Sequence, residues 1–425
     1  MMSSMYSAVS GLATHQKKMD VIGNNIANVN TIGYKKGQAV FKEIFSQTIQ
    51  GAGAPQGGKG GTNPQQIGLG VDLGAVTTIH TQGGVQRTGK PTDLMIDGEG
   101  FFIVSDDESL NNRYYTRAGN FDRDEAGNLI TVDGMKVLGY NTDGELVPLR
   151  IDKTERVPSV ASNMIGIIGN LDSRLAEDEV YNTDTTIKDS LGNSYKVNFE
   201  FKKTGDSNTW ELAIGSIENI SNGDIVNIDN PSAPIEITFG DSGELNTING
   251  SGTDFNIDIQ IEDIDGSFFG NGDDIINLDL SKLSQDANKN DAKGFDGGKD
   301  GESGSASGNL TGFSISADGV ITGVFSNGMN KTLGQIALAE FDNNSGLEKI
   351  GNNLFQVTPN SGEPQINTPG SSGLGDIKAT SLEMSNVDLS MEFTDMITTQ
   401  RGFQANSRVI TTSDEMLQEL TNLKR

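Results

Sequence analysis

The apolar residues at the two ends of the chain repeat at helical spacing, and the repeat does not continue between them. Near the N-terminus one stripe, interrupted by a histidine, advances in steps of four and three residues: Ala8, Leu12, His15, Met19, Ile22, Ile26 and Val29. Near the C-terminus a second stripe repeats every seven residues and closes at Leu420: Met396, Phe403, Ile410 and Leu417. Such steps are typical of coiled-coil helices. The chain is therefore expected to begin and end in a helix.

Both stripes are narrow and contain polar residues, which makes each helix marginal by itself. Thr399, Asn406 and Ser413 occupy alternate core positions of the C-terminal stripe. Two terminal helices packed on a globular core would be the ordinary interpretation. Residues 31–385, however, follow strand and turn patterns almost throughout. We therefore expect the helices to pair with each other and with copies of themselves, along a seam formed by Leu12, Met19, Ile22, Ile26, Val29, Met396, Phe403, Ile410, Leu417 and Leu420.

The middle of the chain predicts short strands separated by glycine turns. Examples are the apolar run Gly100–Val104, the alternating segment Lys196–Phe201, and the turn dipeptides Asp97-Gly98, Asp133-Gly134 and Asp143-Gly144. Glycine supplies 54 of 425 residues, about twice the usual share. The fold class expected is mainly β and multidomain, with stacked β domains and terminal α-helices that pair as a coiled coil.

Changes in composition predict four parts. The segment Gly51–Gly70 is rich in glycine, glutamine and asparagine and has too little apolar content to fold alone. The expected parts are a helical domain from 1–34 and 386–425, a linker or extended arm at 35–70, an inner β domain from 71–160 and 309–385, and an outer β domain at 161–308.

The charge balance excludes several classes of protein. The chain has 31 Lys and Arg against 58 Asp and Glu, a formal charge of −27, so a polyanion would be repelled and nucleic-acid binding is excluded. No apolar run is long enough to span a bilayer, and the N-terminal residues lack the apolar core of a secretory signal. No membrane partner and no cleaved leader are expected. The excess of acid in Ser251–Glu302 marks that segment as an outward, solvated part.

No catalytic or cofactor site is expected. Cysteine is absent and the two histidines, His15 and His80, have no partners at metal-ligand spacing. Asp122–Asp133 imitates a calcium loop but lacks the glutamate at position twelve, and a β-hairpin turn explains it better. The segments Gly250–Ile257 and Gly270–Asn277 are predicted to be acidic surface turns. The chain is therefore not expected to be an enzyme.

Two terminal strings resemble the signatures of bacterial flagellar rod and hook proteins. VIGNNIANVNTIGYKK, at Val21–Lys36, is similar to their N-terminal motif, and Ser385–Arg425 is similar to their C-terminal helix. The resemblance continues inward through GVQRTGKPTDLMIDGEGFFIV, YYTRAGNFDRDEAGNLITVDG and DSLGNSYKVNFEF. It covers nearly the whole chain except about residues 215–308.

Within that family the sequence favours a hook-type subunit over a distal-rod subunit. Rod subunits look similar at both ends but lack a large inserted outer domain, whereas about 150 residues intervene here at 161–308. The resemblance implies that copies polymerise into a curved hollow tube, a universal joint that transmits motor torque to the filament. It implies an extracellular location in the flagellar hook, attached to the basal body.

The resemblance also implies particular partners. These are the distal rod protein below, the hook–filament junction protein above, the hook cap during assembly, and the flagellar type III export apparatus. Phe41 and Phe45, in the string FKEIF, resemble the element by which such subunits engage the export gate, although an ordinary amphipathic turn would give the same pattern.

Alternatives from other classes remain open at this point, including an enzyme with an acidic cleft, which would require two carboxylates that converge in a pocket. A secreted adhesin or glycan-binding β protein would use the acidic, turn-rich middle as its binding surface. That interpretation leaves the two terminal stripes without an explanation.

Overall fold

The fold is taken from a computed structural model that describes residues 2–422 apart from 56–59, 108–109, 206–207, 227, 231–233, 251–254, 262–268, 270–274 and 298–302. The chain divides into two compact units. The first unit is Met1–Asp152, Phe313–Gly323 and Thr332–Arg425, and the second is Lys153–Gly312 and Val324–Lys331. The segments Gly250–Ile257 and Gly270–Asn277 were expected to be acidic turns, and their residues 251–254 and 270–274 lie outside the described residues. Asn256 and Ile257 belong to strand β22 (Asn256–Ile261) and Ile275–Asn277 to strand β23 (Ile275–Asp286), so the expectation is wrong for these described residues, which extend a sheet.

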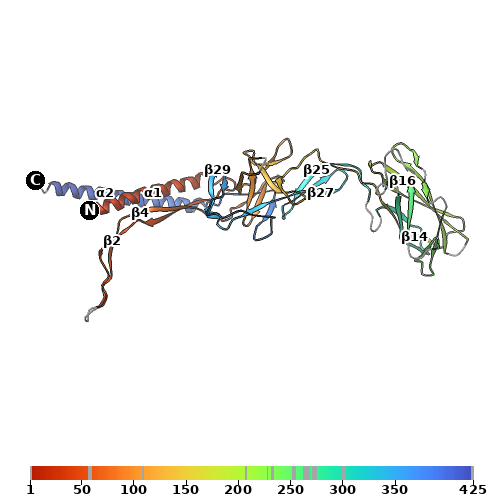
Figure 1. The fold of residues 1–425 in the computed structure, drawn as a ribbon, viewed down its shortest axis with the longest axis horizontal. Coiled ribbons are helices and arrows are strands. Elements are labelled where there is room, and N and C mark those ends of the chain that lie inside the picture. The colour runs from red at the N-terminus through yellow and green to blue at the C-terminus, as the bar shows by residue number, and fades with distance from the viewer. Residues whose placement is uncertain are drawn as a thin grey trace. The chain divides into compact units, whose positions relative to one another are not determined.

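The first unit contains both long helices, α1 (Met2–Ala27) and α2 (Leu389–Asn422). They lie side by side with their outer ends, and so both chain termini, at the same end of this unit (Figure 1). Helix α2 begins where the Asp388 carboxylate accepts hydrogen bonds from the backbone N–H groups of Ser390 and Met391, a standard N-cap. The expectation of terminal helices that pack together is confirmed.

The chain between α1 and the β region forms a long hairpin. Strand β1 (Gly37–Glu43) pairs with β4 (Val71–Thr78), and β2 (Ser46–Gln50) pairs with β3 (Gln65–Gly68), both antiparallel. Helix α1 packs against β1 and β4, whereas every residue of β2 and β3 is exposed. The part near the helices is therefore supported by α1, and the part beyond it lacks cover in the single chain.

The rest of the first unit is a β region built around one sheet. Neighbouring strands in its part of the sheet run in the order β27 (Asn330–Ile336), β11, β7, β8, β30 and β29, with β12, β28, β31, β9 and β10 at the sides. Its strands outside the arm are β5 (Val85–Arg87), β6 (Leu94–Asp97), β7 (Phe101–Ser105), β8 (Arg113–Thr116), β9 (Asp122–Arg123), β10 (Leu129–Ile130), β11 (Lys136–Tyr140), β12 (Leu146–Pro148), β28 (Leu338–Glu340), β29 (Glu348–Gly351), β30 (Leu354–Gln356), β31 (Gln365–Asn367), β32 (Asp376–Ala379) and β33 (Ser381–Glu383), with a 3-10 turn η1 (Asn344–Gly346).

The core of that β region is rich in aromatic residues. Phe101, Tyr115, Phe341 and Phe355 pack together, with Phe101 entirely buried. The last two strands before α2 return to this region, because β32 pairs with β6 and β33 pairs with β5. The chain thus enters and leaves the β region close to the start of α2.

The second unit contains two sheets with one shared core. One sheet has the strand order β19, β22, β23, β14, β24 and the other β15, β16, β17, β20, β21, with β18 beside β17. The core contains Trp210, Phe199 and Phe201, all fully buried. The strands are β13 (Arg156–Val157), β14 (Met164–Asp172), β15 (Val180–Lys188), β16 (Ser194–Lys203), β17 (Thr209–Asn219), β18 (Ile225–Val226), β19 (Ile228–Asn230), β20 (Ile235–Phe239), β21 (Leu245–Ile248), β22 (Asn256–Ile261), β23 (Ile275–Asp286) and β24 (Lys293–Asp296).

The division between the units falls within three strands, β25 (Gly308–Ile315), β26 (Val320–Phe325) and β27 (Asn330–Ile336). Several local expectations are confirmed. Strand β16 alternates inward and outward as the sequence predicted, and Asp122–Asp133 is a hairpin in which the Asp124 carboxylate accepts from the backbone and side chain of Asn128. Gly134 and Gly144 occupy the left-handed region that their turns require.

Candidate functional site

The two terminal helices meet in an antiparallel pair with polar contacts along it. The Asn25 side chain donates a hydrogen bond to Glu392 Oε2 at 3.2 Å, and Lys18 Nζ lies 3.7 Å from Asp395 Oδ1. These contacts join the C-terminal half of α1 to the start of α2. They fix which part of one helix faces which part of the other.

Helix α2 carries its predicted seam residues on one line with buried polar residues. Glu392, Thr399 and Ser413 are buried. The predicted seam residues alternate with these buried positions along the helix and also repeat every seven residues. All four are half-buried: Met396, Phe403, Ile410 and Leu417. The side chain of Leu420 lies outside the described residues. Their assignment to an assembly seam stays a prediction.

On α1 the buried positions are small or polar, with the exception of Ile22. Ala8 and Ile22 are buried, and so are Gly11, Thr14 and Asn25. Of the predicted seam residues only Ile22 belongs to this set.

The other predicted residues of α1 lie to the side of that line. Leu12, Met19 and Ile26 are half-buried, and Val29 lies beyond the end of the helix at Ala27. The most buried line of α1 therefore passes through Gly11 and Asn25, each one residue before the predicted positions Leu12 and Ile26.

Apolar side chains remain exposed on both helices. On α2 Met391, Phe393 and Ile397 are 58%, 49% and 52% exposed, and Met416 is 49% exposed. On α1 Tyr6 and Val9 are similarly open. Exposed apolar residues on both helices mark surfaces suited to a protein partner.

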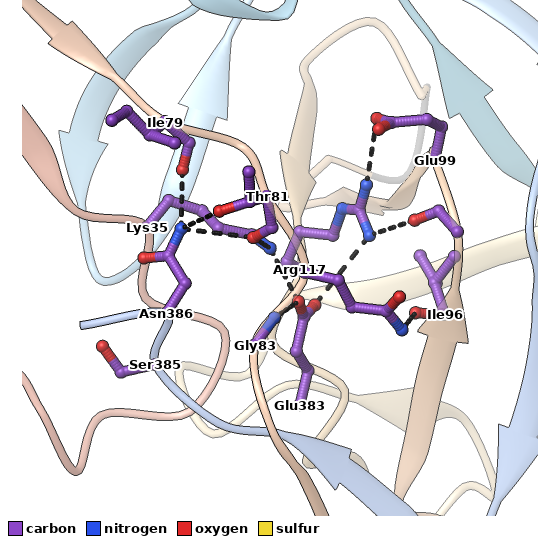
Figure 2. Close-up of polar contacts among 12 residues, drawn as sticks. Lys35, Ile79, Thr81, Gly83, Ile96, Glu99, Arg117, Glu383, Ser385 and Asn386 are labelled. Atoms are coloured by element: carbon purple, nitrogen blue, oxygen red, sulfur yellow. Dashed lines mark hydrogen bonds and ion pairs between the residues drawn. The ribbon is translucent and has the colours of Figure 1, made fainter. Parts of the chain in front are cut away.

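Where the helices join the β region, three charged side chains are buried together. This junction cluster consists of Lys35, Arg117 and Glu383, each no more than 1% exposed (Figure 2). Lys35 Nζ donates to Glu383 Oε1 at 2.6 Å and to the carbonyl of Thr81 at 2.8 Å. Arg117 Nη1 lies 3.9 Å from Glu383 Oε2 and donates to the carbonyl of Gly98.

The junction cluster pins the two chain segments that leave the helices. Lys35 follows α1 by eight residues and Glu383 precedes α2 by six. The backbone N–H of Gly33 also donates to the carbonyl of Glu383 at 2.8 Å, and the N–H of Gly83 donates to its carboxylate at 2.8 Å. Next to it, Asn386 accepts from the N–H of Lys36 and donates to the carbonyl of Ile79 (Figure 2). Both helices are thus tied to the β region at one place.

Burial makes the cluster electrostatically demanding. Desolvation lowers the pKa of Lys35 and of Arg117, and the Glu383 carboxylate opposes both shifts. His80 lies beside them against the rings of Phe101 and Phe355. Burial and the nearby cations lower the pKa of His80 to about 4, so its ring is neutral at physiological pH. One carboxylate therefore balances two buried cations, assisted by the more exposed Glu99.

The two phenylalanines of the predicted export element lie in different surroundings. Phe41, on β1, is half-buried and meets the ring of His15 edge to face at 5.9 Å between centroids. Phe45 is 73% exposed on the arm. The structure brings Phe41 to helix α1 and leaves Phe45 free of the helices, and their role in export stays a prediction.

Sequence reasoning missed the junction cluster. Its members are separated by as many as 348 residues, and no local pattern marks a lysine, an arginine and a glutamate as partners at such distances.

In the described ranges no group of three or more His, Asp and Glu side chains is placed to hold a metal ion. The helices described are also too polar to cross a membrane.

Four family models match the chain. They are described as flagella basal body rod protein (residues 5–35), flagellar hook protein FlgE/F/G D1 domain (95–168), flagellar basal body protein FlaE D2 domain (151–297) and flagellar basal body rod FlgEFG protein C-terminal (378–423). The terminal matches contain most of α1 and α2. The D2 match falls on the second unit.

Curated relatives match from end to end. A flagellar hook protein FlgE of Borreliella burgdorferi is 38% identical, with 100% of both chains covered. A flagellar basal-body rod protein FlgG of Bacillus subtilis is 32% identical, again over 100% of both. A solved structure, the flagellar hook protein FlgE2 of Helicobacter pylori, has a TM-score of 0.50 at 17% identity and covers 70% of this chain and 100% of its own, which is a likeness of fold.

Proposed function

The chain belongs to the FlgE/F/G family of flagellar hook and basal-body rod proteins, and on that premise we propose that it is a structural subunit of the bacterial flagellar hook. Many copies polymerise into a curved hollow tube that works as a universal joint between motor and filament. The observation that carries the proposal is the end-to-end match to a hook protein at 38% identity, which includes the D2 region.

The chemistry of the terminal helices supports polymerisation. Their apolar side chains are only partly covered in one chain, with Phe393 and Ile397 about half exposed. Burying such side chains against neighbouring copies removes apolar surface from water, and this is the main driving force for association. The conclusion that follows is a homopolymer whose inner layer is made of these helices.

The proposal extends to the partners at each end of the tube. A hook subunit meets the distal rod protein below, the hook–filament junction protein above and the hook cap during growth. It leaves the cell through the flagellar type III export apparatus without a cleaved signal peptide, with Phe41 and Phe45 as the element read at the export gate, and it comes to lie outside the cell in the hook.

A distal-rod subunit is the second candidate. The end-to-end match to a FlgG rod protein favours it. The D2 match over residues 151–297 and the higher identity to a hook protein place the hook first.

Electron microscopy of basal bodies from cells lacking this protein separates the two candidates. A hook subunit predicts complete rods that end without hooks, restored by the gene for this chain. A rod subunit predicts truncated rods. Normal hooks in the deletion strain would contradict both.

A further inference from the structure

The apolar pattern of α2 does not by itself fix how α1 and α2 align. Met396, Phe403, Ile410 and Leu417 recur every seven residues, so sliding α2 by seven residues puts one apolar residue where another was. A strict heptad stripe thus permits several registers. Something else must select the observed one.

The first selective contact is between Gly402 of α2 and His15 of α1. A Cβ atom added at Gly402 would lie 2.8 Å from both Cε1 and Nε2 of His15, so any larger residue there would require the imidazole ring to move. The ring also meets the ring of Phe41 edge to face, at 5.9 Å between centroids. His15 therefore fills a gap that α2 provides at one position.

The second contact has the opposite sense. A Cβ atom added at Gly11 of α1 would lie 2.6 Å from the side-chain nitrogen of Asn406 on α2. Each helix thus presents one glycine and one larger side chain four residues away, and each larger side chain lies against the other helix's glycine. The two contacts are reciprocal.

The third contact is the buried hydrogen bond from Asn25 to Glu392, which is 5% exposed. The amide of Asn25 is saturated: it also donates to the carbonyl of Gly37, and its oxygen accepts from the N–H of Gly37 and the hydroxyl of Tyr34. Because the amide is held in place by the start of β1, it offers Glu392 a donor at one fixed position.

The three contacts agree on one alignment. On α1 the contact residues Gly11, His15 and Asn25 are separated by four and then ten residues. Their partners on α2, Asn406, Gly402 and Glu392, are separated by the same numbers of residues in the opposite chain direction. We propose that these six residues form a register key, which admits one antiparallel alignment of the terminal helices and rejects the heptad-shifted ones. The inference goes beyond the proposed function and rests on it only where hooks are used as the readout.

A slip of seven residues would break every part of the register key. His15 would face Asp395 or Val409 in place of Gly402, and both have side chains where the ring now lies. Asn25 would face Ser385 or Thr399 and lose its carboxylate, which leaves buried polar groups unpaired. The cost falls on the shifted alignments alone, which is how buried polar residues specify register in coiled coils.

The test exchanges the large and small residues of one contact. Gly402→Leu should reduce the paired helices about tenfold, as overpacking a filled site does, and cells should lose most of their hooks. Adding His15→Ala should restore the hooks, because the leucine side chain on α2 can then fill the space that the imidazole ring on α1 leaves. Gly23→Leu is the matched control: it places the same side chain on α1 where no atom of the chain lies within 4 Å of an added Cβ, and the pairing of α1 with α2 should be unaffected.

A crosslink reads the register directly. The chain has no cysteine, so Lys18→Cys with Asp395→Cys, at the positions of the observed ion pair, can be joined within one chain by a short bifunctional maleimide, in isolated hooks and in the purified full chain. The crosslinking yield should be high in the double-cysteine chain and in the same chain with Gly402→Leu and His15→Ala. It should fall at least about threefold when Gly402→Leu is added alone. Undiminished crosslinking with Gly402→Leu would overturn the register key, and so would an exchange variant that fails to recover it. A deletion strain that still builds hooks would instead overturn the proposed function and leave the crosslink result standing.

Discussion

The terminal helices and the β regions differ in how completely one chain buries their apolar residues. In the β regions Phe101, Phe199 and Trp210 are entirely buried. On α2 Phe393 and Ile397 remain about half exposed, and the buried positions beside them are occupied by Glu392 and Thr399. Each β region therefore buries its large apolar side chains within the single chain, whereas the helix pair leaves part of its apolar surface exposed.

That difference indicates where stability comes from in each region. Burial of a large apolar side chain contributes about 1.5–3 kcal/mol, and the β cores contain dozens of such side chains. Helices with a narrow, polar seam gain little from pairing with each other alone. We infer that the β regions fold in the single chain and that the helices reach full stability when copies cover their exposed faces.

The largest effect is expected from charge in the helical seam. Phe403→Asp or Ile410→Asp should abolish hook assembly, because an unpaired carboxylate would be buried between helices. The β regions should remain folded, as judged by circular dichroism and by the fluorescence of Trp210, the only tryptophan. Counting hooks on basal bodies measures the effect.

Thr411→Asp is the matched control for that experiment, because Thr411 is exposed on the same helix. It should assemble normally. Normal hooks from Phe403→Asp and Ile410→Asp would place the seam elsewhere on α2.

The next largest effect is expected at the junction cluster. Lys35→Met leaves the carboxylate of Glu383 with a partner 3.9 Å away in Arg117 and removes its 2.6 Å contact. Removing one partner of a buried pair typically costs about 3–5 kcal/mol. Denaturant unfolding of the purified chain should show this loss in the first unit, while the Trp210 transition of the second unit stays in place.

The exposed ion pair between Lys90 and Asp122, at 3.3 Å, provides the control. Lys90→Met should change the free energy of unfolding by less than about 1 kcal/mol, since solvent screens such pairs. Equal decreases in the free energy of unfolding from Lys35→Met and Lys90→Met would show that the buried cluster contributes no more stability than an exposed ion pair.

Much of the fold followed from local patterns in the sequence. The heptad spacing of Met396, Phe403 and Ile410 placed α2 correctly because a helix repeats its faces at nearly that period. The Asp-Gly turns were recognisable because glycine at positive φ is a local requirement, met at Gly134 and Gly144. Such features depend on neighbours in sequence.

The candidate site was less predictable because its contacts depend on distant residues. A hydrophobicity pattern selects Leu12 and Ile26 as the inner positions of α1, yet Gly11 and Asn25 are more buried. The reason is that close packing against Asn406 and hydrogen bonding to Glu392 outweigh apolarity there. The pairing of Lys35 with Glu383 likewise follows from how β33 returns beside β5.

A smaller, pH-dependent effect is expected from His80. Its pKa is about 4 in the folded chain and about 6.5 when unfolded, so folding favours the neutral ring. The stability that this provides is complete above pH 6.5 and is lost as the pH falls toward 4, because the unfolded chain then binds a proton that the folded chain does not. The loss is about 1.4 kcal/mol per pH unit.

His80→Phe isolates this contribution, because a phenyl ring retains contacts with Phe101 and Phe355 without titrating. Unfolding of the first unit, measured between pH 7 and pH 4, should depend on pH less steeply by about one proton in the variant. Parallel curves for the two proteins would exclude His80 as the titrating group.

The smallest effect is expected from the ion pair between the helices. Lys18 and Asp395 are 28% and 53% exposed and lie 3.7 Å apart, so Lys18→Ala should weaken the helix pair by less than about 1 kcal/mol. Hooks should form in normal numbers and dissociate on heating only slightly earlier than the unsubstituted hooks. A complete loss of assembly would mean that this charge pair, more than the apolar seam, holds the helices.

Hydrogen exchange of the free chain and of assembled hooks, read by mass spectrometry, tests the central claim most directly. In the free chain, where the helices pair but are only marginally stable, we expect faster exchange over residues 2–27 and 389–422 than in strands such as β7 and β16. In hooks the helical segments should become protected while the strands change little. Equal protection of the helices in the free chain and in hooks would contradict the claim that copies of the chain complete their folding.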